Sequence, residues 1–173
     1  EPVLTEYFSF YEIFNYNPVE ISVATGAYNV KGGSYGLVIF THKDNPVSQL
    51  TLKQLDGIFG TERNGGYDKF VWKPDAARGP EGDLRTWDQL GLQGEWAGKP
   101  IQTYGYALTG MNIVFQQKVF NGGEKWNPNY REYVETNTKQ VGSEKLTTHA
   151  MLTELSQNRY GIAWTGAWQA KGF

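Results

Sequence analysis

An apolar run followed by a capped amphipathic helix is the feature that most constrains the fold. The run LVIFTH at residues 37–42 has the character of a strand that is covered on both faces. Downstream, Thr51 and Gln54 have the spacing of a capping box, in which each side chain bonds to the backbone N–H of the other residue. Gly60 is placed to end this helix. The positions expected on its buried face are Leu52, Leu55, Ile58 and Phe59.

Strand-like and helix-like segments alternate along the rest of the chain. Strands are predicted at residues 19–24, 99–106 and 160–168, and helices at about 109–120 and 144–158. The second of these helices has as core candidates Leu146, Met151, Leu152 and Leu155. A short N-terminal helix is indicated by rings at helical spacing, Tyr7, Phe10, Tyr11 and Phe14. Residues 61–99 are rich in turns, which is typical of an irregular insertion or a functional loop. This order predicts an α/β fold with a mixed sheet flanked by helices.

The composition excludes several classes of function. The chain has no cysteine, which rules out disulfides, thiolate metal sites and a cysteine nucleophile. Its two histidines, His42 and His149, are far apart in the sequence, so a histidine-based metal site or catalytic triad has little support. A net charge of −2 gives no basic field that would attract nucleic acid. No apolar run approaches the roughly 20 residues that span a bilayer. We therefore expect no nucleic-acid partner, no metal and no cofactor.

Several segments carry a resemblance to a known family. The segment GLVIFTHKDNPVSQLTLKQLDGIFG at residues 36–60 resembles the phosphate-type solute-binding proteins of bacterial ABC importers. In that family an apolar strand, HKDNP and an LTxxQLxxIF helix lie at the edge of the second lobe. Segments that resemble later parts of the family follow in the same order: TWDQLG (86–91), KPIQTYGY (99–106), FQQKVF (115–120) and NRYGIAWTGAW (158–168). The resemblance covers roughly residues 18–173.

The resemblance implies a division of the chain into three parts. The family has two lobes joined by two crossover strands, and the ligand lies between the lobes. We expect residues 1–35 to form an N-terminal helix and a crossover arm toward a missing first lobe. Residues 36–160 are expected to form the α/β ligand-binding lobe, of the type II class of periplasmic binding proteins. Residues 161–173 then form the returning crossover strand.

The implied function is non-catalytic binding of phosphate or a similar small anion by a substrate-binding protein. The implied partner is an ABC permease, and the implied location is periplasmic or extracellular. The alternative is a protein–protein interaction module, without a small ligand, that associates with itself through the terminal arms. Trp164 and Trp168 would support that alternative, because a missing first lobe would leave apolar surface exposed on the returning arm. A hydrolase would need a nucleophile–base pair, and no such spacing is recognisable.

The candidate ligand site is the predicted strand-to-helix turn GYALTGMN at residues 105–112. At this turn the family has a motif close to R-x-x-GSGT, and Tyr106 stands at about the position of its arginine. Free N–H groups and the positive dipole end at a helix start attract anions. These backbone donors need only the turn geometry, whereas the charge and most hydroxyls of the motif are absent here. The candidate residues are Tyr106, Leu108, Thr109, Gly110, Met111 and Asn112. Alternatively, Thr109 only caps the helix and Gly110 only eases the turn.

Two other sets of side chains admit both a functional and a structural explanation. His42 follows a predicted strand and would contact a ligand if that strand end faces the cleft, or else it lies on the surface beside a turn. The carboxylates Asp75, Glu81 and Asp83 lie on either side of Arg78 in the sequence and could serve acid–base chemistry or hold a hard cation. The simpler interpretation is a solvated loop with a local ion pair.

Overall fold

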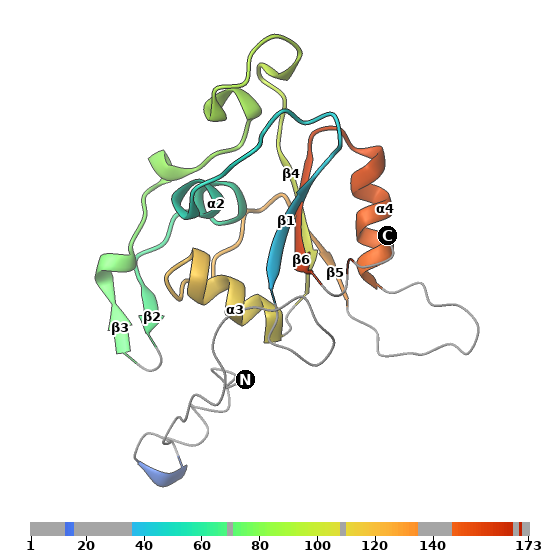
Figure 1. The fold of residues 1–173 in the computed structure, drawn as a ribbon. Helices are drawn as coiled ribbons and strands as arrows, with labels where there is room; N and C mark the ends of the chain where they lie inside the picture. The colour runs from blue at the N-terminus through green and yellow to red at the C-terminus, as the bar shows by residue number, and fades with distance from the viewer. Residues whose placement is uncertain are drawn as a thin grey trace, which may run out of the picture.

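A four-stranded mixed sheet forms the centre of the molecule (Figure 1). The computed structural model describes residues 13–15, 36–68, 71–107, 110–134, 147–167 and 170. Within them the strand order is β1-β6-β4-β5. The strands are β1 (Leu37–Thr41), β4 (Gln102–Tyr106), β5 (Tyr130–Tyr133) and β6 (Gly161–Gly166). Strands β4, β5 and β6 run parallel to one another, and β1 pairs antiparallel with β6.

Helices cover both faces of this sheet. Helices α2 (Leu52–Phe59) and α3 (Gly110–Val119) lie on one side and contact each other, and α4 (Thr147–Gln157) lies on the other side (Figure 1). Helix α4 packs on β6, β4 and β5. The expected α/β class, a mixed sheet flanked by helices, is therefore confirmed. Each helix among the described residues is too short or too polar to cross a membrane.

The capping box predicted for α2 is present. The backbone N–H of Thr51 donates to Gln54 Oε1 at 2.8 Å, and the backbone N–H of Gln54 donates to Thr51 Oγ1 at 3.2 Å. Three of the four residues expected on the buried face are buried, Leu55, Ile58 and Phe59. The expectation for Leu52 is wrong, because its side chain is 61% exposed. The helix meets α3 through its last turn, where Phe59 contacts Phe115, so its first turn projects away from the core.

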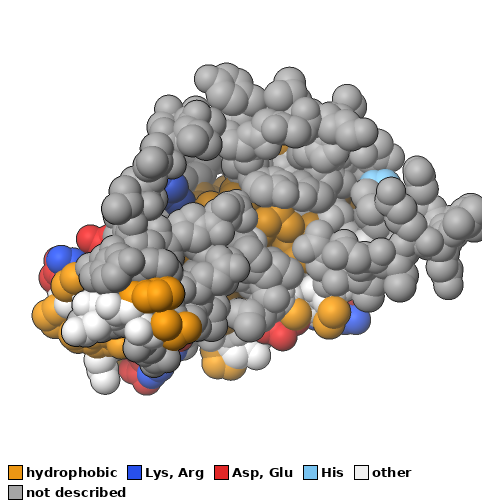
Figure 2. Space-filling view, turned by 90° about the horizontal axis from the view of Figure 1, so that it is seen from below, with side chains coloured by type: hydrophobic (Ala, Val, Ile, Leu, Met, Phe, Trp, Pro, Cys, Tyr) orange, Lys and Arg blue, Asp and Glu red, His pale blue; other side chains and the backbone are white. Residues whose placement is uncertain are grey.

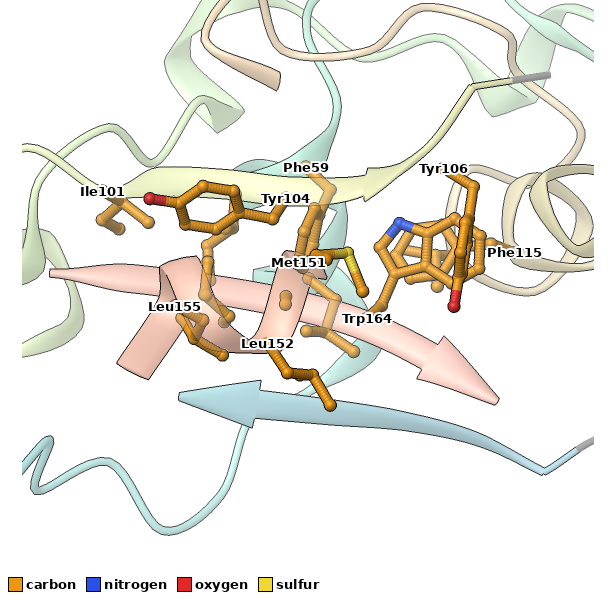
Figure 3. Packing of buried hydrophobic residues seen from close by; sticks show 14 of the residues in the cluster. Phe59, Ile101, Tyr104, Tyr106, Phe115, Met151, Leu152, Leu155 and Trp164 are labelled. Atoms are coloured by element: carbon orange, nitrogen blue, oxygen red, sulfur yellow. The ribbon is translucent and has the colours of Figure 1, made fainter. Parts of the chain in front are cut away.

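Aromatic rings dominate the core between α3 and the sheet (Figure 3). The ring of Phe115 stacks on Trp164 with centroids 4.8 Å apart, and on Trp126 at 5.3 Å. Trp164 is fully buried, which removes it from the apolar surface that we expected on the returning arm; Trp168 lies outside the described residues. On the other face, α4 buries the predicted Met151, Leu152 and Leu155. The fourth candidate, Leu146, lies outside the described residues.

The turn-rich residues between α2 and β4, 61–101, contain short regular elements and are called the cover segment below. It contains a hairpin of β2 (Gly66–Asp68) and β3 (Val71–Lys73) and short 3-10 helices at Pro74–Ala76, Pro80–Gly82, Trp87–Leu90 and Gly94–Trp96. An ionic network ties it to α2: Arg63 binds both carboxylate oxygens of Asp56, and Asp83 binds Arg78 and Arg85. For Asp83 the local ion pair is therefore confirmed. No group of three residues able to hold a metal occurs in the described ranges.

Other element boundaries shift by a few residues from the prediction. The strand expected at 99–106 begins at Gln102, the helix expected at 144–158 is described from Thr147 to Gln157, and the strand expected at 160–168 is described from Gly161 to Gly166. Strand β5 was not predicted. The strand expected at 19–24 and the ring-bearing positions Tyr7, Phe10 and Tyr11 lie outside the described residues.

Candidate functional site

The carboxyl ends of the parallel strands meet at one edge of the sheet, together with the starts of two helices. Figure 3 shows β4 and β6 pointing the same way, with Tyr106 at the end of β4 and β1 running in the opposite direction. Helix α3 begins at Gly110, just after β4 ends at Tyr106. Helix α4 precedes β6 and runs back along the sheet, which brings its first turn to the same edge. In open α/β sheets, ligands bind outside this edge.

The hydroxyl of Tyr106 lies in a buried cluster of hydroxyl groups. It shares hydrogen bonds with Thr148 Oγ1 in the first turn of α4 and with Thr165 Oγ1 on β6, the latter at 2.5 Å. Tyr106 and Thr165 are fully buried, and Thr148 nearly so. The Tyr106 side chain is thus neutral and engaged in the interior. It joins the start of α4 to β6 and β4.

The carbonyl oxygen of Tyr106 receives two side-chain donors. Asn112 Nδ2 donates to it from the first turn of α3 at 2.7 Å, and the Tyr130 hydroxyl donates to it from β5 at 3.1 Å. The next backbone N–H, of Ala107, donates to the Tyr133 carbonyl oxygen at 2.9 Å. Three hydrogen bonds, two from β5 and one from α3, therefore hold the backbone that leaves β4 before the turn begins.

The Tyr130 hydroxyl is itself held in place. It accepts a hydrogen bond from Trp164 Nε1 at 3.1 Å, and its ring stacks on Trp126 with centroids 4.4 Å apart. Burial raises the pKa of Tyr130 far above its ordinary value of 10, so the phenol keeps its proton and its ability to donate. Glycine at position 105 makes the approach possible, since a Cβ there would lie 2.0 Å from Tyr130 Oη and 2.4 Å from Trp164 Nε1.

The structure brings some of the predicted site residues together. Tyr106 and Asn112 are linked directly, and Asn112 is 3% exposed, with its amide directed at the strand carbonyl. Met111 is 5% exposed and belongs to the core. Gly110 is the first residue of α3, whereas Leu108 and Thr109 lie outside the described residues. Sequence reasoning did not find Thr148, Thr165, Tyr130 or Trp164 as members of this site.

The described side chains that hydrogen-bond to Tyr106 carry no formal charge. In Figure 2, which views the molecule from below, hydrophobic side chains are visible near the middle of the face and also at its lower left, where charged side chains lie beside them. On β5, Arg131 is paired with Glu154 of α4 at 2.6 Å, and the Tyr133 hydroxyl bonds to the same carboxylate. Burial, followed by that hydrogen bond, raises the pKa of Tyr133 above its ordinary value.

The remaining candidates from the sequence lie elsewhere. His42 follows β1, which runs antiparallel to β6, so it sits at the opposite edge of the sheet from Tyr106. Its Nδ1 accepts the backbone N–H of Asp44 at 3.2 Å, as in the local-turn interpretation. His149 lies on α4, half-buried. A surface hollow between the β2–β3 hairpin and α3 is lined by polar groups, among them Lys73, Asp75 and Gln117, but it does not reach the Tyr106 turn.

Sequence comparison relates the chain to proteins of known name. Two curated relatives are each called phosphate-binding protein PstS, one from Pseudomonas aeruginosa PAO1 and one from strain UCBPP-PA14. Each is 31% identical over 159 residues, which cover 91% of this chain and 38% of the relative. The chain thus spans about two fifths of the length of these relatives. No protein-family model matches it.

A similar solved structure is the crystal structure of a possible phosphate binding protein from Planctomyces limnophilus DSM 3776. It superposes with a TM-score of 0.46 and 16% sequence identity. The superposition covers 76% of this chain and 36% of that one.

Proposed function

The chain is PstS-like, related by sequence to a part of the phosphate-binding proteins of that name, and from this premise we propose that it is a non-catalytic solute-binding lobe for phosphate or a similar small anion. The sequence similarity carries the proposal. A match over 91% of 173 residues includes the β4–α3 turn wherever the match begins. The turn lies at the sheet edge where α/β proteins bind ligands.

The chemistry of the turn suits an anion. The first N–H groups of a helix have no partner within the helix, and the helix dipole places partial positive charge at the same end. Helix α3 presents its start directly after β4, and α4 presents its start at the same edge through Thr148. We place the ligand contacts at Gly110 and its neighbours Leu108 and Thr109, with Tyr106, Met111 and Asn112 shaping the turn.

The affinity of this lobe is expected to be weak. The side chains that hydrogen-bond to Tyr106 supply hydroxyl and amide groups, so none of these bonds brings a formal positive charge to the ligand. A charged donor makes hydrogen bonds roughly twice as strong as a neutral one. A single lobe also supplies one side of a site that two lobes enclose when they close by a hinge motion.

The domain organisation, the partner and the location are proposed from the same sequence relationship. We propose that residues 36–166 form the ligand-binding lobe, since β6 (Gly161–Gly166) is a central strand of its sheet, and that residues 1–35 and 167–173 are arms that cross toward a first lobe. The proposed partner is an ABC permease, and the proposed location is the periplasm or the cell exterior. Self-association through the arms loses one of its supports, because Trp164 is buried in the core of this lobe.

Calorimetric titration tests the proposal. Phosphate is titrated into the chain with sulfate as the control anion, and the mass in solution is measured in parallel. Saturable heat with phosphate from a monomer supports the proposed lobe. Absence of heat with phosphate, together with a concentration-dependent dimer, would instead support an interaction module.

A further inference from the structure

The Tyr106 carbonyl oxygen is the last backbone acceptor of β4 before the turn, and its position sets the direction in which the chain continues. A carbonyl oxygen has two lone pairs, and here Asn112 Nδ2 and Tyr130 Oη bond to it at 2.7 and 3.1 Å. Because the peptide group is planar, fixing this oxygen also fixes the N–H of Ala107 on the other side of the same peptide. That N–H bonds to the Tyr133 carbonyl oxygen at 2.9 Å.

A chain of hydrogen bonds connects this peptide to β6. Trp164 Nε1 on β6 donates to Tyr130 Oη on β5, and Tyr130 Oη donates to the Tyr106 carbonyl oxygen on β4. The stacked rings of Tyr130 and Trp126 hold the phenol in its plane. Gly105 leaves room for both polar atoms beside β4. The phenol therefore lies between a donor, Trp164 Nε1, and an acceptor, the Tyr106 carbonyl oxygen.

We propose that Tyr130 is a positioning residue for the anion-binding turn. It fixes the peptide from which the turn starts, acts through the Tyr106 carbonyl oxygen, and does not touch the ligand. Trp164 orients Tyr130, so the returning strand β6 is coupled to the turn by the same two hydrogen bonds. Asn112 holds the same oxygen from the helix side. The inference rests on the proposed function for the identity of the ligand, whereas its structural part concerns the free protein.

The test compares Tyr130→Phe with Tyr104→Phe. Each variant removes one phenol oxygen from a buried or half-buried hydrogen bond, and the Tyr104 hydroxyl bonds to Asn158 rather than to the turn. Two quantities are measured: phosphate affinity by calorimetry, and backbone amide exchange of the free protein at Ala107 and in the first turn of α3. Exchange in α4 serves as an internal reference for general loosening.

Tyr130→Phe is expected to weaken phosphate binding by roughly three- to tenfold, the effect of one lost hydrogen bond, and to speed exchange at Ala107 and the start of α3. Tyr104→Phe is expected to leave both unchanged. Wild-type affinity and wild-type exchange at the turn in Tyr130→Phe would overturn the inference, and so would equal acceleration in α4.

The test separates this inference from the proposed function. If the wild-type protein binds no phosphate, the proposed function fails, while faster exchange at the turn in Tyr130→Phe still supports the positioning role. If Tyr130→Phe does not fold, Trp164→Phe takes its place, since it removes the donor that orients the same hydroxyl. That variant is expected to speed exchange at the turn more than in α4, and the reverse order would overturn the inference.

Discussion

Arg63 binds Asp56 through both carboxylate oxygens, with Nη1–Oδ1 at 2.6 Å and Nη2–Oδ2 at 2.7 Å, and both side chains are more than nine-tenths buried. Arg63 Nε also donates to the Ala76 carbonyl oxygen, so the pair joins α2 to the segment that covers it. Removing one member of a buried pair leaves the other charge uncompensated. This pair therefore holds the cover segment in place.

Arg63→Met is expected to lower the free energy of unfolding by about 3 kcal/mol, because Asp56 would remain buried without its bidentate partner, beside Arg78 Nε at 3.3 Å. Urea unfolding measures the change. The matched control is Arg159→Met, which breaks a bidentate pair with Glu95 that is exposed to solvent and so contributes much less. Equal losses in the two variants would contradict the structural role of the buried pair.

Phe115→Ala should be among the most destabilising substitutions in the core. Its ring stacks on Trp164 and meets Phe59 edge-to-face at 5.3 Å, so truncation leaves a cavity between α3 and the sheet. The expected loss is about 3–5 kcal/mol, measured by urea or thermal unfolding. Leu52→Ala is the control on α2, and its exposed side chain predicts a change within about 0.5 kcal/mol. A large loss in the control would mean that Leu52 is buried after all.

Gly105→Ala should destabilise the protein by about 1–3 kcal/mol through overpacking, since the new methyl would meet Tyr130 Oη at 2.0 Å. The effect should be coupled to Tyr130. In the Gly105→Ala background, Tyr130→Phe removes the closest clashing atom, so it should cost less than it does in the wild-type protein. Unfolding of the two single variants and the double variant measures the coupling. Strict additivity would mean that the two residues do not touch.

The free energy of unfolding is expected to depend on pH through Asp88, which lies in the cover segment. Its carboxylate accepts the Gly98 backbone N–H at 2.8 Å, and this bond, followed by one from Thr86, holds the pKa of Asp88 below its ordinary value of 3.8. A lowered folded pKa means that the charged form stabilises the fold above the ordinary pKa, and that this contribution is lost as pH falls through the lower folded value. Asp88→Asn should therefore reduce the fall in the free energy of unfolding at acid pH, as measured by unfolding at a series of pH values. An unchanged fall at acid pH would contradict this assignment.

Local signals in the sequence predicted local structure well. Thr51 and Gln54 are three residues apart, and their reciprocal hydrogen bonds depend on little beyond that spacing. Strand β5 was missed because it is an edge strand whose central residues, Arg131 and Glu132, are exposed and carry no apolar alternation. Leu52 was misplaced because helical periodicity identifies a face, but it does not tell which turn of the helix reaches the core.

The candidate site was only partly predictable. The strand-to-helix turn at Tyr106 could be located, because a strand pattern, a glycine-containing turn and a helix follow one another. The contacts of Tyr106 could not, since Thr148 and Thr165 are 42 and 59 residues away in sequence and meet it only through the sheet topology. For Tyr130 the only available signal was Gly105, whose missing side chain indicates a close neighbour without naming it.

The central claim is that a small anion binds at the start of α3, and residue-resolved NMR titration tests it most directly. Phosphate is added to the isotope-labelled chain while backbone amide shifts are followed, with sulfate as the control anion. The account predicts saturable shifts concentrated at Ala107 to Asn112 and at the first turn of α4, and little change in the surface hollow lined by Glu62, Arg78 and Lys125. Saturable shifts confined to that hollow, or no shifts at all, would contradict it.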